Sequence, residues 1–331
     1  MDAAKLHSHI ARFGTDMQKR LLVVGSINMD LVAATERIPL AGETVSGSSF
    51  RTFPGGKGAN QAFAAARLGA AVGMIGKVGN DAFGSELRAS LDGSGVDTSA
   101  VDVASTSSGL AQITTAANGD NAIVVVGGAN SHLSPRDLDG HLNLIRKAGI
   151  LLAQLEIPFE TVEHLAQIAR HENIPLILDP APARSLPTSL LECVDWLTPN
   201  ETETCALLEF KTQNLPQEAI EEAATQLLRR GSKNVVLKLG SRGCYLALSD
   251  GRRALVPAFL VRAVDTTGAG DAFNGAFAAA LLEGKDPISS ASWASAVAAI
   301  SVTRHGAQPS MPTQEEVDLF LIDNADLERT T

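Results

Sequence analysis

The sequence predicts an α/β protein in which a doubly wound, mostly parallel sheet is accompanied by a second, smaller β-sheet. Short apolar runs that end in Gly, Pro, Asn or Asp alternate with stretches of helical periodicity, as expected of βαβ units. Two stretches, 31–56 and 109–128, interrupt this alternation and show no helical period. The length of 331 residues, with 45% hydrophobic and 19% charged residues, suits one large domain with insertions or two domains.

Six apolar runs are predicted to be buried strands of the larger sheet. Each run is short and is followed at once by a turn residue, which is typical of strands buried on both faces. Ligands of such sheets bind at the carboxyl ends of the strands, so the polar residues that follow these runs are candidate site residues. The predicted strands span residues 21–27, 71–79, 149–155, 175–182, 195–201 and 234–240.

The helices and the smaller sheet fill the remaining sequence. The two interrupting stretches are predicted to pair as a small sheet, and Asn118–Asp120 has the Asn-Gly signal of a hairpin turn. We expect one domain over 21–322, an N-terminal tail over 1–20 and a C-terminal tail over 323–331. The predicted helices span residues 57–69, 81–93, 159–172, 216–231, 271–284 and 286–303.

Composition excludes several classes of protein. The net charge is −10 and no cluster of Lys and Arg is present, so a nucleic-acid partner is not expected. No apolar run approaches the roughly 18 residues of a membrane span, and the first 20 residues lack the apolar core of a signal peptide. Cys193, Cys205 and Cys244 form no CxxC pair. We therefore predict a cytoplasmic protein without a membrane partner.

The stretch "DTTGAGDAFNGAFAAALLEG" (265–284) is the first candidate for chemistry. A glycine-rich turn that opens a helix presents free backbone N–H groups at the positive end of the helix dipole, where a phosphate or another anion can bind. Gly268 and Gly270 would let the backbone approach such a ligand, and the buried apolar face of the helix would direct Asp271 outward. By itself, Asp271 could also be an ordinary acidic residue of a first helical turn.

A second glycine-rich turn precedes the helix that begins near residue 57, in "FPGGKGANQAFAAARLG" (53–69). Lys57 and Asn60 supply donors for hydroxyl groups, and "GSINMD" ends the first strand with Asn28 and Asp30. Each piece could be turn or capping chemistry. Together, two anion-binding helix N-termini and polar strand ends suit phosphoryl transfer to a polyol. Neither turn is a Walker loop, and the GxGxxG of dinucleotide-binding dehydrogenases is absent after the first strand.

These residues resemble the ribokinase-like (PfkB) family of carbohydrate kinases over roughly residues 20–322. The motifs that carry the resemblance occur in the family's order: "GSINMD", "PGGKGANQA", "QLE" (154–156), "DPAPAR", "TPNETE", "LGSRG", "VDTTGAGDAFNGA" and "VTRHGAQPSMP". The resemblance implies a three-layer α/β sandwich with a β-sheet lid, a homodimer formed through the lid, and MgATP-dependent phosphorylation of a sugar hydroxyl. The substrate that it implies is D-ribose, phosphorylated at O5.

The resemblance also assigns residues to each ligand. The catalytic base would be Asp271, with the backbone N–H groups of Ala269, Gly270 and Asp271 as the anion hole. The helix dipole should keep Asp271 ionised, so we expect it to be a weak base. The sugar site would consist of Asn28, Asp30, Gly56, Lys57, Gly58, Ala59, Asn60, Glu156 and Asp271. The nucleotide would be surrounded by Asn200, Lys238, Leu239, Gly240, Ser241, Arg242, Gly243, Gly270, Asp271 and Ser295.

A potassium ion is the further cofactor that the resemblance implies. Potassium-dependent members of the family bind the ion between the turn before the base and a later loop, here "SVTRHGAQPS". The site would consist of Asp265, Thr267, Ser301, Arg304, Gly306 and Ser310.

Two residues depart from the family pattern, and other functions stay open. Lys238 stands where a Thr is frequent, and Ser295 stands where a His can lie beside adenine. We keep a related kinase for deoxyribose, a ketohexose or a nucleoside as the nearest alternative. A non-catalytic sugar or nucleotide sensor of the same fold is a further alternative, which the intact GAGD turn disfavours.

Overall fold

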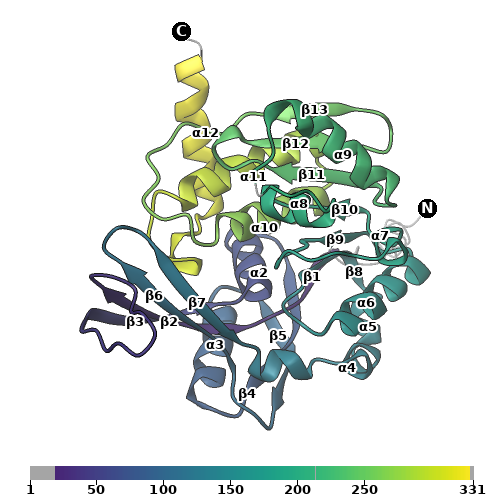
Figure 1. The fold of residues 1–331 in the computed structure, drawn as a ribbon. Helices are drawn as coiled ribbons and strands as arrows, with labels where there is room; N and C mark the ends of the chain where they lie inside the picture. Colours follow the sequence, from purple (N-terminus) through teal and green to yellow (C-terminus); the bar gives the residue numbers. More distant parts are fainter. Residues whose placement is uncertain (1–18, 213, 329–331) are drawn as a thin grey trace, which may run out of the picture.

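A nine-stranded, mostly parallel sheet forms the centre of the molecule (Figure 1). The computed structural model describes residues 19–212 and 214–328. The strands of the large sheet are β1 (Arg20–Val24), β4 (Val72–Gly79), β5 (Asp97–Ala104), β8 (Ala148–Ala153), β9 (Leu176–Leu178), β10 (Trp196–Leu197), β11 (Asn234–Lys238), β12 (Cys244–Ala247) and β13 (Arg253–Val256). Their order is β13-β12-β11-β10-β9-β8-β1-β4-β5, and only the β11–β12 and β12–β13 pairs are antiparallel. The predicted fold class is confirmed.

Helices cover both faces of this sheet, so that the molecule has three layers. Alternate residues of β1 enter different hydrophobic cores, Leu21 and Val23 on one face and Leu22 and Val24 on the other, as the strand period of two requires. The helices are α2 (Lys57–Arg67), α3 (Ala82–Gly93), α4 (Pro135–Gly140), α5 (Leu142–Ile145), α6 (Phe159–Glu172), α7 (Thr188–Leu191), α8 (Glu201–Leu207), α9 (Ile220–Arg229), α10 (Ala269–Leu282), α11 (Pro287–Ser301) and α12 (Gln314–Glu328). Short 3₁₀ turns are η2 (Gly128–His132), η3 (Gln217–Ala219), η4 (Gly240–Arg242) and η5 (Gln308–Ser310).

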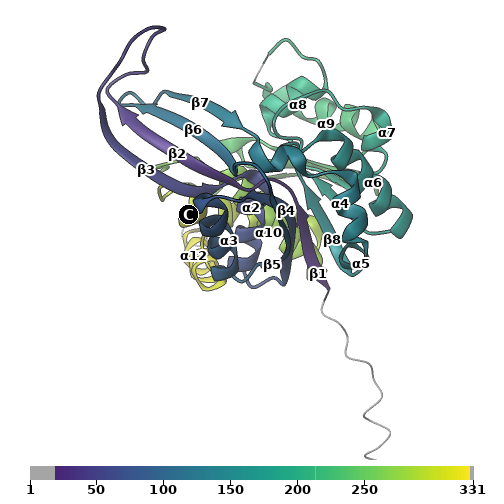
Figure 2. The ribbon, with the colours of Figure 1, turned by 90° about the horizontal axis from the view of Figure 1, so that it is seen from below.

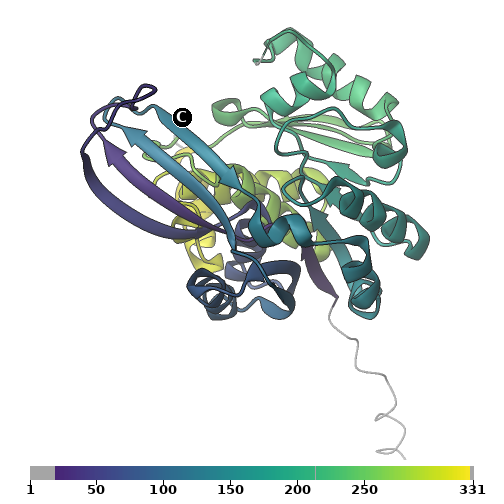
Figure 3. The same cartoon turned by 60° about the horizontal axis from the view of Figure 1, so that its bottom comes forward.

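The second sheet consists of the two stretches that interrupt the alternation. Its strands are β2 (Asn28–Thr35), β3 (Gly47–Gly55), β6 (Gly109–Ala116) and β7 (Asn121–Val126), in the order β3-β2-β6-β7. Figures 2 and 3 show that this sheet projects from the body of the molecule. Only residues 25–27 separate β1 from β2. Asn28 and Asp30 were predicted to end the first strand, but they belong to β2, where the chain passes from the large sheet to the small one.

Some elements differ from those predicted. β5, β12 and β13 and the short helices α4, α5, α7 and α8 were not among the predicted elements, and α12 continues to Glu328, beyond the predicted domain end at 322. Most of the predicted N-terminal tail lies outside the described residues, and its last residue, Arg20, begins β1. Across the described part of the chain, no helix is both long and apolar enough to cross a membrane.

The contact between α2 and α10 determines how the two glycine-rich turns meet. At Gly275 of α10, a β-carbon would lie 2.5 Å from the Gln61 carbonyl and 2.8 Å from the Ala64 side chain. Only a residue without a β-carbon permits this close approach of the two helices. The first turn of α2, with Asn60 and Gln61, therefore lies beside Asp271 at the start of α10.

Candidate active site

Five polar residues follow neighbouring strands at one edge of the large sheet. Because β11, β10, β9, β8 and β1 are adjacent and parallel, their carboxyl ends lie at the same edge. In this order the edge carries Lys238, Asn200, Asp179, Glu156 and Asn28. The structure thus places residues predicted for the nucleotide and residues predicted for the sugar along one line.

Asp271 lies in the first turn of α10 and is 5% exposed. Its carboxylate accepts hydrogen bonds from Asn60 Nδ2 at 2.9 Å and Gln61 Nε2 at 3.0 Å. Burial raises the pKa of this carboxyl; the charge of Lys57 acts in the opposite direction, and the charge of Asp179 adds to the increase. We expected from sequence that the helix dipole would keep Asp271 a weak base. The raised pKa makes it a stronger one.

Two free amides lie beside this carboxylate. The N–H of Ala269 donates to the Thr266 carbonyl at 3.2 Å. Within the described chain, the N–H groups of Gly270 and Asp271 have no backbone or side-chain acceptor. The first turn of a helix leaves such donors open, and they carry the positive end of the dipole. An anion at this position would therefore be bound by Gly270 and Asp271, two of the three amides predicted.

The residues predicted for the sugar form a continuous set of contacts. Glu156 accepts from Ser26 Oγ at 2.6 Å and from the Lys57 amide at 3.1 Å. Asn28 accepts from Asn130 Nδ2 at 2.7 Å. Gly56, Gly58 and Ala59 contribute backbone only: the Ala59 amide donates to the Ser26 carbonyl at 2.9 Å, and the Gly56 carbonyl accepts from the Asn60 amide at 2.8 Å.

Asp30 completes this set on the first strand of the small sheet. Its carboxylate lies against Gly55 of β3, where a β-carbon would be 2.4 Å from Asp30 Oδ2. Burial raises the pKa of Asp30 to about 7, and the charges of Glu156 and Asp271 add to the increase. Three carboxylates, those of Asp30, Glu156 and Asp271, are thus close enough to affect one another.

Two adjoining cavities lie next to Asp271. The larger has a volume of about 340 Å³ and an apolar lining that includes Phe259, Phe273 and Val302, together with Ser295, Ser241 and Gly243. The smaller has a volume of about 300 Å³ and a polar lining. The two cavities adjoin, because both are lined by Lys238, Gly240, Thr266, Ala269 and Gly270. The apolar cavity suits an aromatic base, and the polar cavity suits a chain of phosphates.

Charged groups of both signs line the polar cavity. Its residues are Lys57, Asp179, Asn200, Glu203, Lys238, Gly240, Thr266, Gly268, Ala269, Gly270 and Asp271. The Asp271 charge raises the pKa of the Lys57 ammonium. Burial raises the pKa of the Glu203 carboxyl, while the nearby Lys238 ammonium opposes the increase. The Asp271 carboxylate therefore favours the charged form of Lys57.

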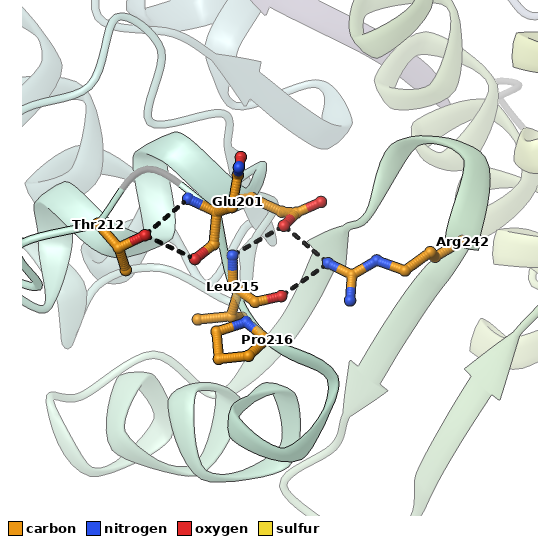
Figure 4. A pocket seen from close by; sticks show the side chains of 6 residues that line it. Glu201, Thr212, Leu215, Pro216 and Arg242 are labelled. Atoms are coloured by element: carbon orange, nitrogen blue, oxygen red, sulfur yellow. Dashed lines mark hydrogen bonds and ion pairs between the residues drawn. The ribbon is translucent and has the colours of Figure 1, made fainter.

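Leu239 and Arg242 are the predicted nucleotide residues that do not line these cavities. Leu239 is 2% exposed and belongs to the core. Arg242 donates to Glu201 Oε2 at 2.7 Å and to the Leu215 carbonyl at 2.8 Å, in a separate open depression of about 650 Å³ (Figure 4). Arg242 neutralises Glu201, the carboxylate that lines that depression. We therefore assign no chemistry to the depression.

The residues predicted for potassium are brought together in part. Asp265 accepts from the Thr267 amide and from the Gly306 amide, each at 2.9 Å. Partial burial opposes ionisation, but these hydrogen bonds lower the pKa of Asp265. The Arg304 guanidinium donates to Glu316 Oε1 at 2.7 Å, so this side chain is paired outside the predicted potassium site. Ser301 and Ser310 donate to the carbonyls of Ala298 and Ala307.

Several residues of the site were not singled out from sequence. Gln61 bridges the two carboxylates of Asp179 and Asp271, and its Oε1 accepts from Gln154 Nε2 at 2.6 Å. Glu203 forms a capping box with Asn200 at the start of α8. Asp179 directly follows a buried strand, and that position could have identified it. Gln61 gave no such signal, because it lies within an alanine-rich helix.

Over most of its length, the chain is similar to known carbohydrate kinases. Residues 18–314 match the model of the pfkB family of carbohydrate kinases. The chain is 44% identical to ribokinase of Bacillus subtilis, over 92% of this chain and 99% of that one. It is 39% identical to deoxyribokinase of Salmonella typhi, over 91% and 98%. The solved structure of Arabidopsis thaliana ribokinase complexed with ribose and ATP superimposes with a TM-score of 0.86, at 37% identity over 92% of this chain and 99% of that chain.

The raised pKa of Asp30 leads to a pH-dependent stability. The folded pKa of about 7 exceeds the ordinary value of 3.8, so the folded protein binds this proton more tightly than the unfolded chain. The stabilisation is fully present below the unfolded pKa and is lost as the pH rises through about 7. We expect ¹³C NMR of the Asp30 carboxyl to show a midpoint near this pH, and Glu156→Gln to lower that midpoint. An unperturbed midpoint in the wild-type protein would contradict the burial argument.

Proposed function

This chain belongs to the pfkB family of carbohydrate kinases, and we propose that it transfers the γ-phosphoryl group of ATP to O5 of D-ribose, giving D-ribose 5-phosphate and ADP. One observation carries the proposal: the buried carboxylate of Asp271 lies beside two open amides. It also accepts a hydrogen bond from Asn60, one of the residues predicted for the sugar (the hydroxyl-binding set), and it lines the polar cavity. The identity to ribokinases favours ribose. The identity to a deoxyribokinase makes 2-deoxyribose the second candidate.

The proposed reaction assigns a task to each part of the site. Asn28, Asp30 and Glu156 would bind sugar hydroxyls, and Asp271 would orient the reacting hydroxyl and accept its proton. The raised pKa of Asp271 brings its basicity closer to that of a useful general base. The open amides of Gly270 and Asp271 would stabilise the negative charge of the phosphoryl group, which is the main requirement of this reaction.

Magnesium fits the polar cavity as a companion of the nucleotide. Among the described residues, no group of three or more His, Cys, Asp or Glu is arranged to hold a metal. Mg²⁺ prefers one or two protein oxygens with phosphates and water, and Glu203 and Asn200 supply oxygens at this cavity. When bound, Mg²⁺ would neutralise charge on the β- and γ-phosphates.

We place the reaction in the cytoplasm, because all three cysteines are free thiols.

A coupled assay of ADP release across a panel of sugars tests the proposal. A buried polar site discriminates against substrates that leave its groups unpaired, so D-ribose should give a higher kcat/KM than 2-deoxyribose, fructose or adenosine. Removal of Mg²⁺ with EDTA should abolish turnover. Asp271→Asn should lower kcat at least about 100-fold while sugar binding is retained, and Asp120→Asn in the exposed hairpin should have no effect.

The outcomes of this assay separate the alternatives. A higher kcat/KM for fructose or adenosine would overturn ribose as substrate and leave the family unchanged. If the Asp271→Asn variant turned over at the wild-type rate, Asp271 would not be the general base. An absence of ADP release with every sugar would favour the sensor alternative.

We also propose that potassium activates the enzyme by binding between the turn at Asp265 and the later loop at Gly306, which meet through a hydrogen bond from the Gly306 amide to Asp265. A large, weakly hydrated cation suits a cage of carbonyls, and it would hold the turn before α10 in shape without contacting substrate. At constant ionic strength, kcat should be several-fold higher in potassium than in sodium or tetramethylammonium, and Asp265→Ala should lose the difference. Equal kcat in the three salts would contradict a potassium site.

Finally, we propose a homodimer formed through the small sheet. Both faces of its edge strand β7 are exposed: Ile123, Val124, Val125 and Val126 are 53%, 61%, 57% and 49% exposed. An apolar edge strand of this kind invites pairing with another chain, and a second copy supplies a matching surface. Light scattering should give twice the chain mass of 34.5 kDa. Val124→Lys should reduce this mass to one chain, whereas Val103→Lys, at a site 58% exposed on β5, should not.

A further inference from the structure

Lys238 and Asp179 form an ion pair at the junction of the two cavities. Lys238 ends β11 and Asp179 follows β9, on either side of β10. Lys238 Nζ lies 2.9 Å from Asp179 Oδ1, and the two side chains are 13% and 2% exposed. The other carboxylate oxygen of Asp179 accepts from Gln61 Nε2 at 2.8 Å. Asp179 is therefore fixed on both sides, and it holds the lysine in one place.

The lysine ammonium lies where a phosphoryl group would meet the first turn of α10. Lys238 Nζ is 3.6 Å from the position that a β-carbon would take on Gly270, whose amide is one of the two open donors. Lys238 also lines both cavities. A positive charge beside the positive end of a helix dipole is unfavourable unless an anion lies between them. Asp179 partly offsets this repulsion, and a bound phosphoryl group would do so directly.

We propose that Lys238 is a catalytic residue that binds the transferring γ-phosphoryl group, and that Asp179 is its positioning residue. The proposal rests on the proposed function. In the reaction the sugar oxygen forms a bond to phosphorus, the bond from phosphorus to the β,γ-bridging oxygen breaks, and the hydroxyl proton passes to Asp271. Lys238 transfers no proton in this step. Its charge, together with the amides of Gly270 and Asp271, stabilises the negative charge on the phosphoryl oxygens.

The competing explanation is that Lys238 only compensates the buried charge of Asp179. Removing one partner of a buried ion pair leaves an unpaired charge and is strongly destabilising, so loss of activity in a single Lys238 variant would fit both explanations. They differ in the double variant. If Lys238 serves only Asp179, removing both charges restores activity. If Lys238 binds the phosphoryl group, the defect persists without Asp179.

Nucleotide affinity provides the direct test, measured by calorimetry on the full chain without sugar. The probes are the Mg²⁺ complexes of a non-hydrolysable ATP analogue with an imido β,γ-bridge and of ADP. A charge-assisted hydrogen bond corresponds to about 10- to 100-fold in affinity. Lys238→Met should weaken binding of the ATP analogue by this factor and that of ADP by less than about threefold. Lys238→Arg should retain most of the affinity for the analogue.

Kinetics of four variants complete the test. Lys238→Met should lower kcat about 100- to 1000-fold, the range for loss of a donor to transition-state charge, with little change in KM for ribose. The double variant Lys238→Met/Asp179→Asn should remain as slow. Asp179→Asn alone should show a smaller defect. Lys233→Met is the matched control, because Lys233 pairs with Asp195 at 2.6 Å on the surface, and it should match the wild type.

Two results would overturn the proposal: equal affinity of Lys238→Met and wild type for the ATP analogue, or recovery of kcat in the double variant to that of Asp179→Asn. If Lys238→Met fails to fold, the affinities for the ATP analogue and for ADP can be compared in the double variant instead, because it leaves no unpaired buried charge. The comparison is also independent of the sugar. A wild-type protein that does not phosphorylate ribose would refute the proposed function and still show whether Lys238 contacts the γ-phosphate.

Discussion

The burial of the Asp271 carboxylate beside open helix amides is the constraint on which the rest of the site depends. A buried carboxylate is costly unless donors satisfy it, and here the donors are the side-chain amides of Asn60 and Gln61. Both belong to α2, more than 200 residues earlier in the chain, and they reach Asp271 because α2 and α10 touch at Gly275. The hydrogen bonding of Asp271 therefore depends on the close contact of α2 with α10 and on the glycine-rich turn that leads into α2.

The large sheet supplies the second requirement, which is a common edge for both ligands. Parallel strands place the residues that follow them at the same edge. Within this order, Asp179 lies between Glu156, a residue of the hydroxyl-binding set, and Asn200, which lines the polar cavity. Gln61 then joins Asp179 to Asp271 through its single amide group. The two halves of the site are thus connected by buried hydrogen bonds as well as by proximity.

Much of this arrangement could be predicted from sequence, and the remainder has identifiable causes. Asn28, Glu156 and Lys238 follow apolar runs, so the parallel sheet predicts their common edge. β5, β12 and β13 were not predicted, because their runs are shorter or alternate, as strands near a sheet edge do. The helix dipole led to a prediction of low basicity for Asp271, but the pKa is raised by burial. That burial comes from a distant helix and leaves no pattern next to Asp271.

The carboxylates of the polar cavity raise a physical question, since a cavity for phosphates should not repel them. Two lysines and three carboxylates line it, a formal balance of one negative charge. Each carboxylate is engaged internally: Asp271 by Asn60 and Gln61, Asp179 by Gln61 and Lys238, and Glu203 by Asn200. Hydrogen bonds of this kind offset part of the negative charge of each carboxylate. The amides of Gly270 and Asp271 are not engaged in this way, so the donors left open at this cavity favour an anion despite the unfavourable sum of charges.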